Sequence, residues 1–129
     1  MNNLTANHIA ECEAELDASL PQSYRAAMLE KNGGDVLWSD IDWELYPIYG
    51  AKQPSHRTSS DMDLLEHTEL AAKWYGFPNR ALAIARNMFG DKLILLRIGR
   101  TYSHRVYYFS HDTGETFCIA DDFSELQRI

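Results

Sequence analysis

The second half of the chain constrains the fold most, because short apolar segments alternate there with turn residues. The stretches between these segments are rich in glycine, asparagine and aspartate, which are typical of tight turns. This spacing predicts an antiparallel sheet built from hairpins. The expected strands lie near residues 82–85, 92–98, 105–109 and 116–119, and the expected turns at 87–91, 99–103 and 112–114.

The first third of the chain carries a helical pattern instead. An apolar stripe at every third or fourth position is formed by Ile9, Cys12, Leu16 and Leu20. Asn7 is the expected N-cap of this first helix. Pro21 suits the first turn of a second helix, which we expect to end near residue 31 because glycines follow it and can adopt a left-handed exit.

A third helix is expected over residues 60–75, after a surface loop at 50–60, because Ser60 and Asp63 resemble a capping box. Asp121 or Asp122 is expected to cap a short last helix. Helices grouped toward one end of a chain and strands toward the other indicate the α+β class. We therefore expect one domain over residues 1–129: an antiparallel sheet of about four to six strands, with N-terminal helices, one inserted helix and a short C-terminal helix packed around it.

Residues 35–49 contain the densest group of aromatic and acidic side chains. Apolar residues at roughly every second position favour extended chain, and Pro47 restricts it to an edge strand or an irregular segment. Aromatic side chains with a charged rim are typical of protein-binding hot spots, whereas the alternative is a core tryptophan beside a solvated acidic edge. The candidate contact residues are Trp38, Asp40, Asp42, Trp43, Glu44 and Tyr46.

The formal net charge of −7 is unevenly distributed. Residues 1–45 hold nine acids and two bases, residues 111–129 hold five acids and one base, and the segment between them is basic. An acidic chain repels nucleic acid and could attract a basic protein, although solubility alone also explains the charge. No apolar run approaches the roughly 20 residues that span a bilayer, and no secretory signal begins the chain, so we expect a cytoplasmic protein without nucleic-acid or membrane partners.

The sequence lacks a recognisable catalytic set. Two cysteines, Cys12 and Cys118, give no disulfide framework, and we expect both to be small buried apolar residues. A zinc site formed by His104, His111 and Asp112 is the one metal alternative, against the simpler interpretation that these are turn residues. No serine-hydrolase elbow or phosphate-binding loop is present. We therefore expect neither enzymatic activity nor a cofactor.

Three short motifs resemble the SUKH superfamily, which contains the yeast cell-wall-assembly regulator and many bacterial immunity proteins. The first runs from Leu20-Pro21 to Asn32-Gly33-Gly34, the second is Gly90-Asp91 followed by an apolar strand, and the third is a strand, a polar hairpin and a final Ala-acid-Phe helix. Their order and spacing resemble the family over about residues 9–129. The structural motif residues are Leu20, Pro21, Tyr24, Gly33, Gly34, Gly90, Asp91 and Phe123.

The chain departs from the family pattern at two places. The insert around residues 50–75 is longer than the minimal pattern, and Met88-Phe89 replaces the small residues that are more usual before Gly90. The resemblance implies an α+β domain without enzyme activity. In bacteria it implies an immunity protein that binds and neutralises a toxin domain, and this step is analogy rather than derivation. The alternatives are a housekeeping interaction module and, from a different class, a small metal-dependent hydrolase.

Overall fold

The computed structural model describes residues 4–49 and 62–129. It contains three α-helices, α1 (Ala6–Leu16), α2 (Gln22–Glu30) and α3 (Leu64–Ala71). The strands are β1 (Asp35–Trp38), β2 (Ile41–Leu45), β3 (Leu82–Arg86), β4 (Lys92–Leu95), β5 (Arg97–Ile98), β6 (Thr101–Tyr102), β7 (Val106–Phe109), β8 (Thr116–Ala120) and β9 (Gln127–Arg128), and a 3₁₀ helix, η2, covers Phe123–Glu125. The α+β class is confirmed.

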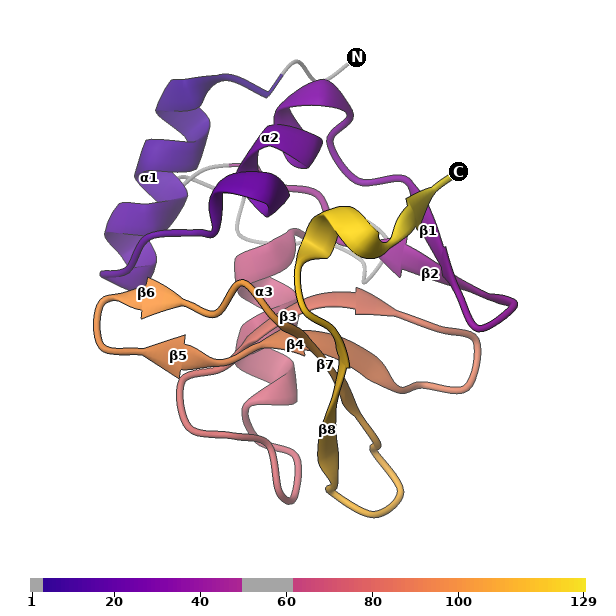
Figure 1. The fold of residues 1–129 in the computed structure, drawn as a ribbon. Helices are drawn as coiled ribbons and strands as arrows, with labels where there is room; N and C mark the ends of the chain where they lie inside the picture. The colour runs from indigo at the N-terminus through magenta and orange to yellow at the C-terminus, as the bar shows by residue number, and fades with distance from the viewer. Residues whose placement is uncertain (1–3, 50–61) are drawn as a thin grey trace.

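One antiparallel sheet organises the molecule (Figure 1). Its strand order is β8-β7-β4-β3-β2-β1-β9, and β5 and β6 form a separate hairpin. The main sheet therefore has seven strands, slightly more than the expected four to six. The additional strand is β9, which pairs with β1 through Val36↔Arg128 and Leu37↔Gln127. A strand of two residues is too short to show an alternating pattern in the sequence.

The sheet curls strongly on itself. Trp43 on β2 and Tyr108 on β7 are three strand spacings apart in the sheet order, which would be about 14 Å in a flat sheet. Their ring centroids are nevertheless 5.4 Å apart, in an edge-to-face contact. The sheet is therefore a half-barrel whose inner face brings distant strands together (Figure 1).

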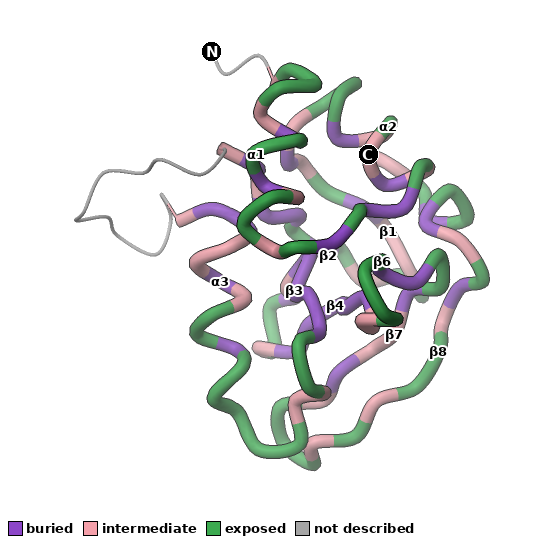
Figure 2. The backbone as a smooth tube through the Cα atoms, turned by 90° about the vertical axis from the view of Figure 1, so that its left-hand side faces the viewer, coloured by how far each residue is buried: buried purple, intermediate pink, exposed green. Residues whose placement is uncertain are grey.

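The core fills both faces of the central strands. β3 and β4 are buried almost throughout, as Figure 2 shows along the middle of the tube. On one side α3 packs against β3, where the Thr68 hydroxyl accepts a hydrogen bond from the Ala83 amide at 3.0 Å. On the other side Tyr24 of α2 meets Phe123 of η2, with ring centroids 5.2 Å apart.

Local capping differs from the expectation at two helices. α1 is capped by Thr5 rather than Asn7, because the Thr5 hydroxyl accepts from the His8 amide and His8 Nδ1 accepts from the Thr5 amide. α3 is capped by Asp63 paired with Glu66, and it ends at Ala71 rather than near residue 75. Ser60 and the expected loop at 50–60 lie outside the described residues.

Two further expectations are wrong. Pro47 does not make the preceding segment an edge strand: β2 lies between β1 and β3, and it ends at Leu45 before the proline could interrupt the ladder. Cys118 is exposed on β8 rather than buried, whereas Cys12 is buried as expected.

The Asn-Gly-Gly motif and the C-terminus together close the fold around α2. The Asn32 side chain exchanges two hydrogen bonds of 2.9 Å with the backbone of Ile48. Gly33 and Gly34 have φ angles of 83° and 79°, which disfavour side chains with a Cβ. The Arg128 guanidinium donates to the carbonyls of Ala27, Lys31 and Gly33 at 3.2, 2.8 and 2.7 Å. The end of α2 is thus tied to a side chain about a hundred residues away, and the Ala27 carbonyl accepts from the Lys31 amide as well.

We expect Arg128→Ala to lower the free energy of unfolding by about 2 kcal/mol, because three carbonyls lose a charged donor. Urea denaturation of both proteins measures this change. Arg100→Ala is the control: its side chain is 82% exposed and lies 3.8 Å from the exposed Asp17, so the effect should stay within about 0.5 kcal/mol. Equal denaturation midpoints for Arg128→Ala and the wild type would contradict the closing role of Arg128.

Candidate functional site

The β1–β2 hairpin carries most of the predicted contact residues. Its register pairs Trp38 with Ile41, so the turn consists of Ser39 and Asp40 alone. Both residues have positive φ angles, 54° and 63°, as a type I′ turn requires. Such angles are costly for residues with a Cβ, although aspartate tolerates them better than most. The turn presents Asp40 as an exposed carboxylate at the tip of the hairpin.

The pleat of the hairpin divides the predicted contact residues between different environments. Trp43 is 0% exposed and Tyr46 is 2% exposed, so both side chains pack in the core. Asp40, Asp42 and Glu44 are exposed, and Trp38 is half-buried. The acids and Trp43 do not form one surface, because successive side chains of a strand point to opposite faces. Tyr46 follows the end of β2 and is buried against Lys92, whose ammonium donates to its hydroxyl.

Trp38 and Trp43 belong to an aromatic row on the inner face of the curled sheet. Tyr108 is the centre of this row: its ring lies 6.2 Å from Trp38, 5.4 Å from Trp43 and 4.9 Å from Phe117. Phe117, on the edge strand β8, is 49% exposed and ends the row. These rings hold β1, β2, β7 and β8 together, which is a structural use of the tryptophans.

The acidic residues gather on the other face of β1 and β2. Asp35 lies directly across from Glu44, and Asp42 lies on the same face two residues along β2. Like charges placed opposite each other across two strands are destabilising. Glu44 is compensated by Arg86 of β3, whose Nε lies 2.9 Å from the carboxylate. Among the described residues, neither Asp35 nor Asp42 forms an ion pair.

An open groove of about 660 Å³ runs beside these acids. It brings β1 and β2 together with the β3–β4 turn and with Trp74, which follows α3. Its lining is Asp35, Asp42, Glu44, Trp74, Arg86, Asn87, Met88, Gly90 and Lys92. In Figure 1 the β1–β2 turn and the β3–β4 turn project on the same side of the molecule, the right in that view.

Lys92 forms the floor of the groove and is unusual in being almost fully buried. It is 8% exposed, and its ammonium group donates to the Tyr46 hydroxyl. The ammonium lies 5.1 Å from the centre of the Tyr46 ring and 5.0 Å from that of Trp74. Burial first, and then the charge of Arg86, lower the pKa of Lys92 to about 8. Within the described part of the chain, no carboxylate pairs with it.

The Gly90-Asp91 motif fixes the turn that borders the groove. The Asp91 carboxylate accepts from the Tyr108 hydroxyl and from the His111 amide at 3.1 Å, and His111 Nδ1 lies 2.7 Å from it. Burial alone would raise the pKa of Asp91, but these hydrogen bonds outweigh it and lower the pKa below its usual value. Gly90, with φ of 92°, lies against the imidazole of His111, so the motif is a structural junction.

The proposed zinc triad is not assembled. The second ring nitrogen of His111, Nε2, lies 3.1 Å from Asp112, so both of its nitrogens face carboxylates. His104 lies instead 3.8 Å from Asp122. Over residues 4–49 and 62–129, no group of three or more histidine, cysteine or acidic side chains is arranged to hold a metal ion.

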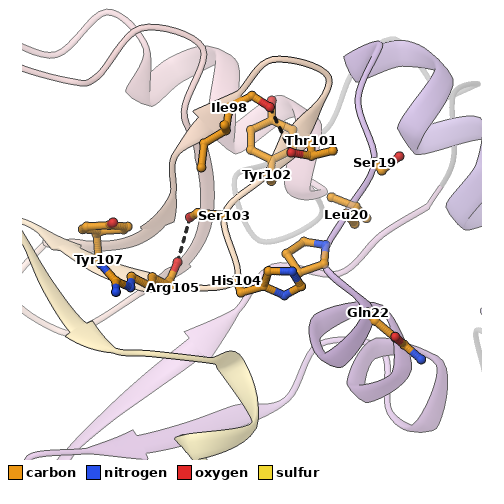
Figure 3. A pocket seen from close by; sticks show the side chains of 11 residues that line it. Ser19, Leu20, Gln22, Ile98, Thr101, Tyr102, Ser103, His104, Arg105 and Tyr107 are labelled. Atoms are coloured by element: carbon orange, nitrogen blue, oxygen red, sulfur yellow. Dashed lines mark hydrogen bonds between the residues drawn. The ribbon is translucent and has the colours of Figure 1, made fainter.

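A second hollow, of about 450 Å³, lies where the Leu20-Pro21 motif meets the β5–β6 hairpin. Figure 3 shows Leu20 and Gln22 on one side and Ile98, Thr101 and Tyr102 on the other. Backbone hydrogen bonds between Ser19 and the hairpin hold the two sides together, at 2.9 Å to the Arg100 carbonyl and 3.0 Å from the Tyr102 amide. At its rim His104 and Arg105 face Asp122 and Asp121. This hollow is the seam between two packed segments.

The comparison with known families decides the relationship. The model of the SMI1 / KNR4 family (SUKH-1) matches residues 3–128. The chain belongs to this family. No curated protein and no solved structure matches it. In this SMI1 / KNR4 domain the motif residues therefore have structural explanations: Tyr24 meets Phe123, the Asn-Gly-Gly turn closes on Ile48 and Arg128, and Asp91 ties the β3–β4 turn to β7.

The sequence interpretation missed several groove residues. Asp35 and Trp74 lie outside the predicted contact segment 38–46: the strand register brings Asp35 to the groove, and the segment after α3 brings Trp74. Lys92 carried a usable signal, because it opens an otherwise apolar strand that is buried on both faces. Among the described residues, no helix is both long and apolar enough to cross a membrane.

We expect Asp91→Asn to lower the free energy of unfolding by about 2 kcal/mol at pH 7, because the charged acceptor for Tyr108 and His111 is lost. The folded-state pKa of Asp91 lies below its unfolded value, so its contribution is complete above the unfolded pKa and disappears as the pH falls through the folded pKa. Chemical denaturation from pH 7 to pH 2 should show the two proteins converging. Asp121→Asn, which removes a 79% exposed carboxylate that pairs with Arg105 rather than with His111, is the control. A constant difference down to pH 2 would contradict this assignment.

Lys92→Met should raise the free energy of unfolding by about 1–3 kcal/mol at pH 7, because a buried unpaired charge is replaced by an apolar chain of similar volume. The folded pKa of about 8 lies below that of an unfolded lysine, so the wild type gains stability as the pH rises from 8 toward 10. The advantage of the variant should therefore shrink over that range. The same measurement on Lys73→Met, at an exposed lysine, gives the reference. If the variant is less stable than the wild type at pH 7, burial of the Lys92 ammonium does not destabilise the folded state.

Proposed function

We propose that this SMI1 / KNR4 domain is a non-catalytic immunity protein, which binds a toxin domain in the cytoplasm of the producing bacterium and neutralises it by stoichiometric contact. Family membership supports a protein-binding role. The observation that carries the proposal is the uncompensated acidic face of the β1–β2 hairpin. Asp40 and Asp42 are exposed there, and Asp35 lies opposite Glu44 across the strands.

A basic partner surface could compensate these carboxylates. Uncompensated carboxylates attract a basic surface, and the attraction accelerates encounter over distances of about 10 Å at 0.1 M salt. Secreted toxins that cut or modify nucleic acids need basic surfaces to hold their substrates, so an acidic inhibitor can cover that surface. We propose Trp38, Asp40, Asp42 and Glu44 as contact residues, with the buried Trp43 and Tyr46 supporting them from within.

The test is binding to the toxin domain encoded by a gene adjacent to that of this protein. The wild type should form a one-to-one complex that abolishes the toxin's activity. Absence of a complex with such a neighbouring toxin would contradict the immunity proposal. If no toxin gene lies next to that of this protein, the housekeeping interaction module becomes the better interpretation.

Charge reversal at Asp40, Asp42 and Glu44, each to lysine, should reduce the association rate at least tenfold at low salt and weaken its salt dependence. Stopped-flow or biolayer interferometry at 50 and 300 mM salt measures both effects. The matched control reverses three exposed acids on other elements, Glu11, Glu15 and Glu30. If the control and the hairpin variant slow association equally, only net charge matters and the contact assignment is wrong.

A further inference from the structure

The turn between β3 and β4 exposes two large apolar side chains side by side. Met88 is 85% exposed and Phe89 is 59% exposed. Turns of this kind ordinarily carry polar or small residues, because their side chains face water. Exposed apolar side chains next to one another, rimmed by polar residues, typically mark an interaction site. We call Met88 and Phe89 the apolar tip.

The apolar tip is held rigidly. Asn87 Oδ1 accepts hydrogen bonds from the amides of Phe89 at 2.9 Å and Asp91 at 3.0 Å, and the Gly90 amide donates to the Asn87 carbonyl at 3.3 Å. Asp91 is in turn held by Tyr108 and His111. Such preorganisation lowers the entropic cost of binding, because the backbone does not need to be ordered by the partner.

The tip is continuous with the acidic groove, since Met88 lines it together with Asp35, Asp42 and Glu44. The two cations of the groove are already engaged: Arg86 pairs with Glu44, and Lys92 is buried beneath Trp74 and Tyr46. The exposed part of this surface is therefore apolar at the turn and negatively charged beside it. Trp74, 36% exposed, adds a further apolar side chain to the wall of the groove.

We propose that Met88 and Phe89 are the apolar anchor of this domain, and that they insert into an apolar pocket of a basic partner protein whose cations contact Asp35 and Asp42. This inference rests on the proposed function and specifies the surface of the toxin: an apolar pocket bordered by lysine or arginine. Phenylalanine brings a large rigid contact area, and methionine adapts to irregular pockets.

Charge selects this partner over a second copy of the chain. Two copies meeting through their tips would bring together two sets of Asp35, Asp40 and Asp42, and close like charges at an interface cost several kcal/mol. A basic partner removes this repulsion and also compensates Asp35, whose cross-strand neighbour Glu44 already pairs with Arg86. The acidic groove thus determines the sign of the partner's charge. The apolar tip supplies the side chains that become buried in the interface.

The experiment measures binding of the toxin domain encoded by the adjacent gene to three proteins: the wild type, Met88→Ser/Phe89→Ser, and the matched control Ile98→Ser. Ile98 is also an exposed apolar residue at a hairpin, 61% exposed, but it lies away from the groove. The tip variant should weaken the dissociation constant on the order of 100-fold, mainly through faster dissociation and with an unchanged salt dependence. Ile98→Ser should bind as the wild type does.

Four outcomes separate the possibilities. Loss of affinity in the tip variant alone, with an unchanged thermal unfolding temperature, supports the anchor. Wild-type affinity of the tip variant overturns it but leaves the proposed function standing. If the wild type does not bind the toxin, the proposed function fails and the inference fails with it. If sedimentation shows a wild-type dimer that the tip variant abolishes, the tip contacts a second copy and the basic partner is wrong.

Discussion

The contact of Tyr108 with Trp43 across the curled sheet is the interaction on which the rest of the structure depends. In a flat sheet β2 and β7 would lie too far apart for these two rings to touch. Their contact therefore holds the sheet in the curvature of a half-barrel. The hydroxyl of the same tyrosine donates to Asp91, which lies at the end of the β3–β4 turn. One side chain therefore links the curvature of the sheet to the position of the turn that carries Met88 and Phe89. Any change that displaces this ring should alter both.

The residues around α2, most of them in the family motifs, stabilise the fold and lie apart from the groove. Asn32, Gly33 and Arg128 join the end of α2 to β2 and β9, and Tyr24 joins α2 to η2. None of these residues is needed at the groove, so the domain can keep its fold while the exposed residues of the β1–β2 and β3–β4 hairpins vary.

The sequence predicted the helices and most strands because amphipathic periodicity and turn residues are local signals. It missed β9 because two residues carry no period, and it misjudged Pro47 because nothing local shows that β2 ends just before it. The acids at 40, 42 and 44 were found by their density. Their separation from Trp43 follows from the pleat, and their meeting with Asp35, Trp74 and the β3–β4 turn depends on tertiary contacts that a local pattern does not contain.

Several features that oppose folding lie in the groove or on the two hairpins that border it. A tight turn holds Ser39 and Asp40 at positive φ, Asp35 faces Glu44 across two strands, and Lys92 is buried without a carboxylate among the described residues. The exposed apolar tip lies beside them. Proteins commonly break local rules at functional sites and recover the stability elsewhere, here through the aromatic row and the closure at Arg128. A basic, apolar partner surface would lower the costs of the acidic face and of the exposed apolar tip, whereas it would leave the backbone strain at Ser39 and Asp40 and the buried ammonium of Lys92 unchanged. The burial of Lys92 is therefore a feature of the groove that binding a purely cationic surface does not explain.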